Sequence, residues 1–115
     1  MDTEKMKNIK NANFNIGQVV KHKYYPFRGV VFDIDPEYAN TEEYLMSIPQ
    51  KIRPTKDQPF YHLLAENSET EYIAYVSEQN LELDDSDEPI CHDEINNIFS
   101  EYIDGSYKLL NNLKN

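Results

Sequence analysis

Three acidic residues alternate along one stretch of the sequence and could form a cation site. Asp33, Asp35 and Glu37 are two positions apart, so a strand would point their side chains to the same face. Oxygen ligands in this arrangement suit a hard cation, but the stretch lacks the glycine and the distal glutamate of a calcium-binding loop. Short aspartates also satisfy backbone donors in turns. We therefore expect Asp35 to support the turn at Pro36, Asp33 to pair with Arg28 or a lysine, and no metal to bind.

The histidines offer weaker metal chemistry. His22, His62 and His92 are not spaced as zinc ligands, and Cys91, the only cysteine, has no second cysteine near it. His22 and His62 both lie in predicted strands and could approach each other across a sheet. One hydrogen bond satisfies a neutral histidine, so we expect both to be hydrogen-bonded structural or surface residues.

The sequence gives little support for catalysis. A nucleophilic serine needs a sharp turn, a base and an orienting group, and no Gly-x-Ser-x-Gly motif is present. The three glycines, Gly17, Gly29 and Gly105, are too few and too far apart to form a phosphate-binding loop. We predict that the protein is not an enzyme and needs no cofactor.

A short basic and aromatic segment could contact nucleic acid. Lys21, His22, Lys23 and Arg28 lie close to Tyr24, and cations with stacking rings are typical of such contacts. The alternative is a solvated strand face.

The charge is unevenly distributed along the chain. Residues 1–60 carry nine Lys or Arg and eight Asp or Glu, whereas residues 61–115 carry two Lys or Arg and thirteen Asp or Glu. The second half therefore has a net charge of −11, and the whole chain has a net charge of −10. A field of this sign repels phosphates and favours basic partners.

We expect one small domain to hold these residues in place, because 115 residues fit a single domain. The sequence pattern predicts that this domain is rich in β-strands. Two-residue alternation predicts strands at 18–24, 28–34, 60–66 and 71–76, a short fifth strand at 81–83, and a hairpin turn at 67–70. In the second strand we expect Val30, Phe32 and Ile34 to share the core face. The long connection 36–59 contains four prolines and one short helix, 42–48, which Thr41 would cap.

The two ends of the chain are predicted to differ from the strands. Residues 1–13 are polar and predict a flexible N-terminal arm, which leaves a domain at 14–104. Apolar residues recur with helical spacing from residue 95 to residue 103, which predicts an amphipathic helix from about Asp93. Gly105 could end this helix, or the tail at 105–115 could continue it through Tyr107, Leu110 and Leu113.

Four segments together resemble one protein family. They are residues 14–22, 28–38, 58–64 and 75–81, and the Asp-Ile-Asp-Pro-Glu-Tyr and Pro-Phe-Tyr-His elements are the most specific. In order and spacing they are similar to the HspQ family, also called the YccV-like or hemimethylated DNA-binding domain family, over about residues 14–99. Phe60 stands where the family often has tryptophan. The resemblance implies an SH3-like antiparallel barrel of four or five strands with a C-terminal helix, and no enzymatic residues.

The resemblance also implies two functions. Family members are linked to bacterial protein quality control, as specificity-enhancing partners of the ATP-dependent protease Lon, and to binding of hemimethylated DNA with control of the replication-initiator level. Self-association as a trimer is suggested for the family. We therefore predict a cytoplasmic adaptor for Lon and its clients, with hemimethylated DNA as the alternative partner and no membrane association. The residues predicted to contact partners are Lys21, His22, Lys23, Tyr24, Arg28, Asp33, Asp35, Glu37, Tyr38, Tyr61 and His62.

Overall fold

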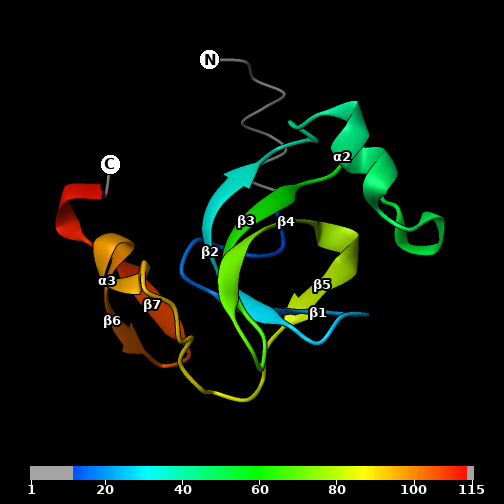
Figure 1. Ribbon diagram of the computed structural model, residues 1–115. Coiled ribbons are helices and arrows are strands. Elements are labelled where there is room, and N and C mark those ends of the chain that lie inside the picture. Colours follow the sequence, from blue (N-terminus) through cyan, green and yellow to red (C-terminus); the bar gives the residue numbers. More distant parts are fainter. Residues whose placement is uncertain (1–11, 114–115) are drawn as a thin grey trace.

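A curved five-stranded antiparallel sheet forms the centre of the protein in the computed structural model, which describes residues 12–113 (Figure 1). Its strands have the order β4-β3-β2-β1-β5, and this confirms the predicted mainly β class. The strands are β1 (Val19–His22), β2 (Arg28–Asp35), β3 (Phe60–Glu66), β4 (Glu71–Ser77) and β5 (Leu81–Leu83). The end strands β4 and β5 do not pair with each other, so hydrogen bonds do not close the described part of the sheet into a barrel.

Each face of the sheet carries a hydrophobic core. The inner face packs around Tyr61 and Leu63, together with Phe14 and Val20. The outer face packs around Leu64. Because apolar side chains are needed on both faces, a simple alternation of buried and exposed positions does not describe these strands.

A β-bulge in β2 changes the faces that we predicted for this strand. Val31 pairs with Leu63, but Asp33 pairs with His62, so Phe32 is an extra residue. Val30 and Phe32 pack on the outer face, whereas Ile34 packs on the inner face. The prediction that these three residues share one core face was therefore wrong, because the bulge shifts the alternation by one residue.

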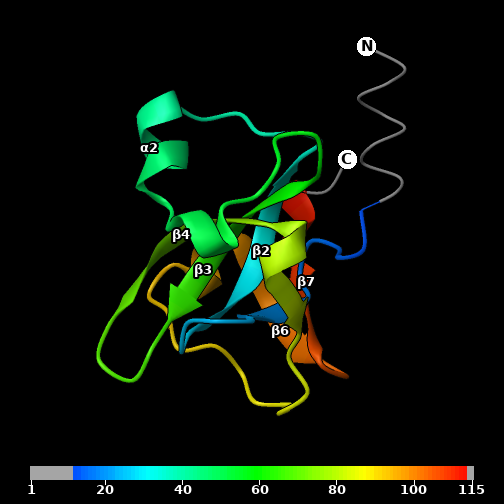
Figure 2. The same cartoon turned by 90° about the vertical axis from the view of Figure 1, so that its right-hand side faces the viewer.

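The prediction of a C-terminal helix was also wrong beyond the first helical turn. The short helix α3 (Ile95–Ile98) is followed by two paired strands, β6 (Phe99–Ile103) and β7 (Ser106–Leu109). Asp104 and Gly105 between them have φ values of 53° and 81°, as a two-residue hairpin turn requires. Figures 1 and 2 show this hairpin against one side of the five-stranded sheet, where Phe99 and Tyr107 complete the outer core.

The C-terminal hairpin also affects the predicted boundaries. The boundary that we placed after residue 104 lies inside the hairpin turn, and residues 106–109 of the tail form a strand rather than a helix, followed by the 3-10 turn η3 (Asn111–Leu113). At the other end, residues 1–11 of the predicted arm lie outside the described residues. Asn13 is held to the domain, since its N–H donates to Glu78 Oε1 at 2.8 Å.

The long connection between β2 and β3 forms the predicted short helix, α2 (Glu42–Ser47), which Thr41 caps by accepting a hydrogen bond from the N–H of Tyr44. A 3-10 turn, η1 (Gln50–Ile52), follows. This segment is held against β4, because the Tyr44 hydroxyl donates to the carbonyl oxygen of Tyr75 at 3.0 Å. Across the described residues, every helix is too short or too polar to cross a membrane.

Candidate functional site

The basic surface that we predicted is largely neutralised by the protein's own carboxylates. Arg28 donates to Glu66 Oε1 at 3.0 Å and to Asp84 Oδ2 at 2.9 Å, not to Asp33 as we had proposed. It also donates to the carbonyl oxygens of Glu88 and Pro89. Its side chain is only 19% exposed, so it holds the acidic segment 84–89 against the sheet and has little capacity left for a phosphate.

The lysines of the same segment differ from each other. The Nζ atom of Lys21 lies 3.6 Å from carboxylate oxygens of both Glu82 and Asp85. Lys23 is exposed at the turn that follows β1, beside the exposed ring of Tyr24. Of the predicted cations, Lys23 is therefore the one that is placed to meet a partner.

His22 organises the turn between β1 and β2 from a buried position. Its Nδ1 atom accepts hydrogen bonds from the N–H groups of Tyr24 at 3.0 Å and Tyr25 at 3.1 Å. An accepting Nδ1 carries no proton, so the neutral ring has its proton on Nε2. Burial lowers the pKa of His22, which favours this neutral form. The ring stacks on Tyr25 with centroids 4.8 Å apart.

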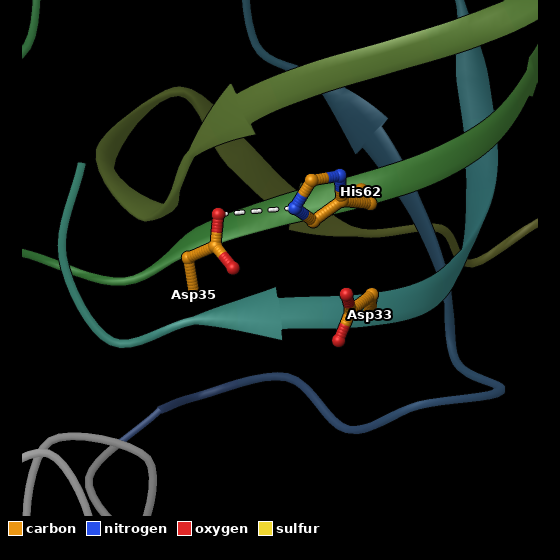
Figure 3. Close-up of side chains that lie close together, drawn as sticks. All are labelled: Asp33, Asp35 and His62. Atoms are coloured by element: carbon orange, nitrogen blue, oxygen red, sulfur yellow. Dashed lines mark hydrogen bonds and ion pairs between the residues drawn. The ribbon is translucent and has the colours of Figure 1, made fainter. Parts of the chain in front are cut away.

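An acidic cluster forms where the β-bulge brings β2 beside β3. His62 Nε2 lies 3.0 Å from Asp35 Oδ2, and the Tyr75 hydroxyl donates to the same oxygen at 2.9 Å. Figure 3 shows His62 pointing from β3 toward Asp35, with Asp33 beside them on β2. Burial raises the pKa of Tyr75, so its hydroxyl keeps the proton that it donates.

Sequence reasoning did not pair His62 with the acidic residues. We considered a contact between His22 and His62, but His62 contacts Asp35 and His22 contacts the turn after β1. The bulge decides which residues of β2 and β3 face each other, and no residue type in the sequence reveals the position of the bulge. Glu37 is exposed beyond the end of β2.

The cluster contains a partial set of metal ligands. One ligand atom from each of Asp33, Asp35 and His62 lies within 4.8 Å of the others. One nitrogen and two oxygens suit a divalent transition metal. His62 and Tyr75 already contact Asp35 Oδ2, so this arrangement is also stable as an ordinary hydrogen-bonded network without a metal.

Two predicted contact residues belong to aromatic packing. Tyr61 is fully buried, its hydroxyl donates to Glu78 Oε1 at 2.7 Å, and the same hydroxyl accepts from the N–H of Phe14. Tyr61 therefore joins the chain before β1 to the core and does not reach a partner. Tyr38 is partly buried against the rings of Phe60 and Tyr75.

An aromatic groove lies beside β4, and sequence reasoning missed it. Its volume is about 350 Å³. It opens between β4, the turn after β1, and the segment that follows α2, and its lining residues include no Asp, Glu, Lys or Arg. The residues that the argument below uses are His22, Tyr25, Tyr72, Ile73, Tyr75 and Ser77. The only signal in the sequence was the long connection 36–59, whose later part forms one wall.

Comparison with known families shows to which family the chain belongs. Residues 12–106 match the family model described as "Hemimethylated DNA-binding protein YccV like". The chain belongs to the YccV-like family. This confirms the resemblance of the four segments, and the family is described by DNA binding rather than by an enzymatic activity.

The chain is also similar to part of a larger protein. The chain is 30% identical over 99 residues to F-box only protein 21 of Mus musculus, of Pongo abelii and of Homo sapiens. The match covers 85% of this chain but only 15% of the mouse and human proteins and 16% of the Pongo abelii protein. The chain thus spans about a sixth of the length of these relatives. No solved structure matches the chain significantly.

Proposed function

We propose that this YccV-like protein is a cytoplasmic, non-enzymatic adaptor that enhances the specificity of the ATP-dependent protease Lon by binding protein partners. The observation that supports this best is the uncharged aromatic groove beside β4. Concave apolar sites with a few polar groups are typical binding sites, and exposed tyrosines are frequent at protein interfaces.

The charge distribution supports a protein partner over a nucleic acid. Arg28 and Lys21 are paired with carboxylates of the same chain, and the net charge is −10. Of the three predicted contact residues Lys21, Lys23 and Arg28, only Lys23 is then left to replace the counterions of a phosphate backbone, whereas a basic region of a protein would be attracted to the acidic chain.

A degradation assay with purified Lon and a client protein tests this proposal. The protein should bind Lon or the client and should increase the rate of client degradation. Tyr25→Ser, which alters the groove, should reduce the stimulation. Tyr24→Ser is the matched control, because Tyr24 is exposed next to Tyr25 but does not line the groove. An unchanged degradation rate with the unmodified protein, together with no binding to Lon, would contradict the proposal.

Hemimethylated DNA is the second candidate partner, and the description of the matching family favours it. Lys23 and the exposed ring of Tyr24 are the groups placed to contact it. Gel shifts at physiological salt should compare hemimethylated, fully methylated and unmethylated duplexes. Specific binding would appear as tighter binding to the hemimethylated duplex that Lys23→Ser weakens. Equal, weak binding to all three would rule it out.

The family resemblance also suggests a homotrimer, which stays a prediction for this chain. Light scattering coupled to size-exclusion chromatography would measure the molar mass in solution. A mass that stays at the 13.6 kDa of one chain across the accessible concentrations would contradict self-association.

A further inference from the structure

β4 has a free edge that faces the aromatic groove. It is an end strand of the sheet and pairs only with β3 among the described strands. The N–H of Glu78 donates to the Pro59 carbonyl oxygen, and that of Asn67 to the Thr70 carbonyl oxygen. Since alternate residues of an antiparallel strand face its partner, the backbone groups of Ile73, Tyr75 and Ser77 point away from β3.

The groove runs along this edge. Consecutive residues 72–77 all line it, although their side chains alternate between the two faces of the strand. A groove must run along the edge of the strand to touch the residues of both faces. The Tyr44 hydroxyl of the same chain already occupies the Tyr75 carbonyl oxygen, so an added strand would pair with the outward-pointing backbone groups on either side of it.

Two polar groups in the groove lack partners. Ser77 is only 2% exposed, and its Oγ atom has no hydrogen-bond partner within the described part of the chain. A buried hydroxyl without a partner is costly, so any rearrangement that gives it a hydrogen bond is favourable. His22 also lines the groove, and in its neutral form the proton on Nε2 is a donor without a partner among residues 12–113.

These features together select one kind of occupant. A free strand edge is complementary to an extended backbone, and the uncharged lining is complementary to uncharged side chains. The net charge of −10 favours basic residues on either side of the bound segment. We propose that the groove binds an extended segment of a client protein, which adds as a strand to β4, inserts apolar or aromatic side chains into the groove, and carries basic flanking residues.

This inference rests on the proposed function only in naming a client as the source of the segment. A synthetic peptide array tests it directly. Short peptides would vary in their central residues (apolar, aromatic, polar or acidic) and in their flanks (lysine, serine or glutamate). The strongest signals should come from uncharged apolar or aromatic centres with lysine flanks. No signal, or a signal that follows net charge alone, would overturn the inference.

The strand geometry is tested on the best peptide of the array by fluorescence anisotropy. N-methylation of two backbone amides that would face β4 should weaken binding about tenfold or more, because each removes one hydrogen bond. N-methylation of the amides on the opposite side of the peptide is the matched control and should change affinity much less. Equal loss from both sets would overturn the added-strand geometry.

A variant of the protein provides the second test. Ile73→Pro removes an N–H that points away from β3, so it costs no ladder hydrogen bond, and proline is tolerated at such edge positions. It should abolish peptide binding, whereas Ile73→Thr, which keeps the N–H, should bind nearly as the unmodified protein does. Thermal unfolding would check that both variants fold, and the N-methylated peptides need no variant at all. Unchanged peptide binding by a folded Ile73→Pro variant would overturn the inference.

The outcomes separate this inference from the function on which it rests. If the peptide binds along β4 but client degradation by Lon does not respond to the protein, the adaptor function fails and the groove assignment stands. If degradation is stimulated equally by an Ile73→Pro variant that no longer binds the peptide, the assignment of a client to the groove fails and the adaptor function stands. Concentration-dependent self-association that Ile73→Pro abolishes would assign the edge to a second copy of the chain and overturn the client assignment.

Discussion

Arg28 was predicted as a partner contact, but its guanidinium group connects three parts of the protein itself. It contacts Glu66 at the end of β3 and Asp84 after β5, and it binds the carbonyl oxygens of the acidic segment that follows. The side chain of Asp84 is only 7% exposed, so Arg28 rather than water is its main polar contact on this side. At the scale of the residue, the same charges that suggest binding serve to hold the domain together.

Replacement of Arg28 should therefore destabilise the protein strongly. Arg28→Met leaves the nearly buried carboxylate of Asp84 without its positively charged partner, and the free energy of unfolding should fall by about 3 kcal/mol. Lys56→Met is the matched control. The Lys56–Glu42 pair has a similar distance, 2.8 Å, but its side chains are 56% and 63% exposed, so water screens the pair and its loss should cost much less than the loss of Arg28. Urea unfolding measures both, and equal losses would contradict this account.

His22 should make the stability depend on pH. Its pKa is lowered in the folded protein from the ordinary value of about 6.5, so the unfolded chain takes up the proton first as the pH falls. The free energy of unfolding should therefore decrease below about pH 6.5. His22→Asn keeps an acceptor near the N–H groups of Tyr24 and Tyr25 but does not titrate.

The comparison of the two proteins isolates the histidine. Between about pH 7.5 and about pH 5.5, the free energy of unfolding should fall less in His22→Asn than in the unmodified protein. Urea unfolding at a series of pH values measures this difference, and other titrating groups contribute equally to both proteins. Parallel pH curves would show that His22 does not titrate differently in the folded and unfolded states.

At the scale of the element, the strands depend on segments far away in the sequence. The segment before β1 reaches the C-terminal hairpin at Gly17, whose carbonyl oxygen accepts from the N–H of Tyr107 at 2.7 Å. Gly17 has a φ of 96°, and a Cβ atom there would overlap the carbonyl oxygen of Tyr107. The contact fixes the hairpin over the outer face of the sheet, where Phe99 and Tyr107 pack.

A pair of glycine substitutions tests this contact. Gly17→Ala and Gly105→Ala both place alanine at a positive φ, which costs about 1 kcal/mol or more. Only Gly17→Ala adds the overlap with Tyr107, since the nearest atom at Gly105 lies 3.7 Å from the added Cβ. The free energy of unfolding should therefore fall by about 1–3 kcal/mol more for Gly17→Ala than for Gly105→Ala. Equal losses would show that the hairpin is not fixed at Gly17.

At the scale of the whole molecule, the acidic field should control how fast partners arrive. A net charge of −10 attracts basic segments over distances that salt screens, while the uncharged groove determines how long they stay. The two effects act on different rate constants, so they can be measured separately.

Stopped-flow measurements with the best groove-binding peptide test this division. The association rate of the lysine-flanked peptide should fall by about tenfold or more as salt rises from low to physiological concentration, with little change in the dissociation rate. The same peptide with serine flanks is the control and should associate at a rate that depends little on salt. Equal salt dependence of the two peptides would contradict a role for the field.

The sequence by itself determined the local elements and the family of this protein. Strand alternation located β1 to β5, the Asn-Ser-Glu-Thr turn joined β3 to β4, and Thr41 capped the short helix, because each of these depends on neighbouring residues. The Asp-Ile-Asp-Pro-Glu-Tyr and Pro-Phe-Tyr-His elements were enough to indicate the YccV-like family.

Only the tertiary structure decided which faces and partners these elements have. The spacing of apolar residues at 95–103 fits a helix, but the buried outer face of the sheet and the Asp104-Gly105 turn made most of it a strand. The bulge at Phe32 placed His62 beside Asp35, and the packing of α2 and η1 near β4 formed the groove. Each of these outcomes is a competition between contacts of residues far apart in the sequence, and local patterns carry no information about such contacts.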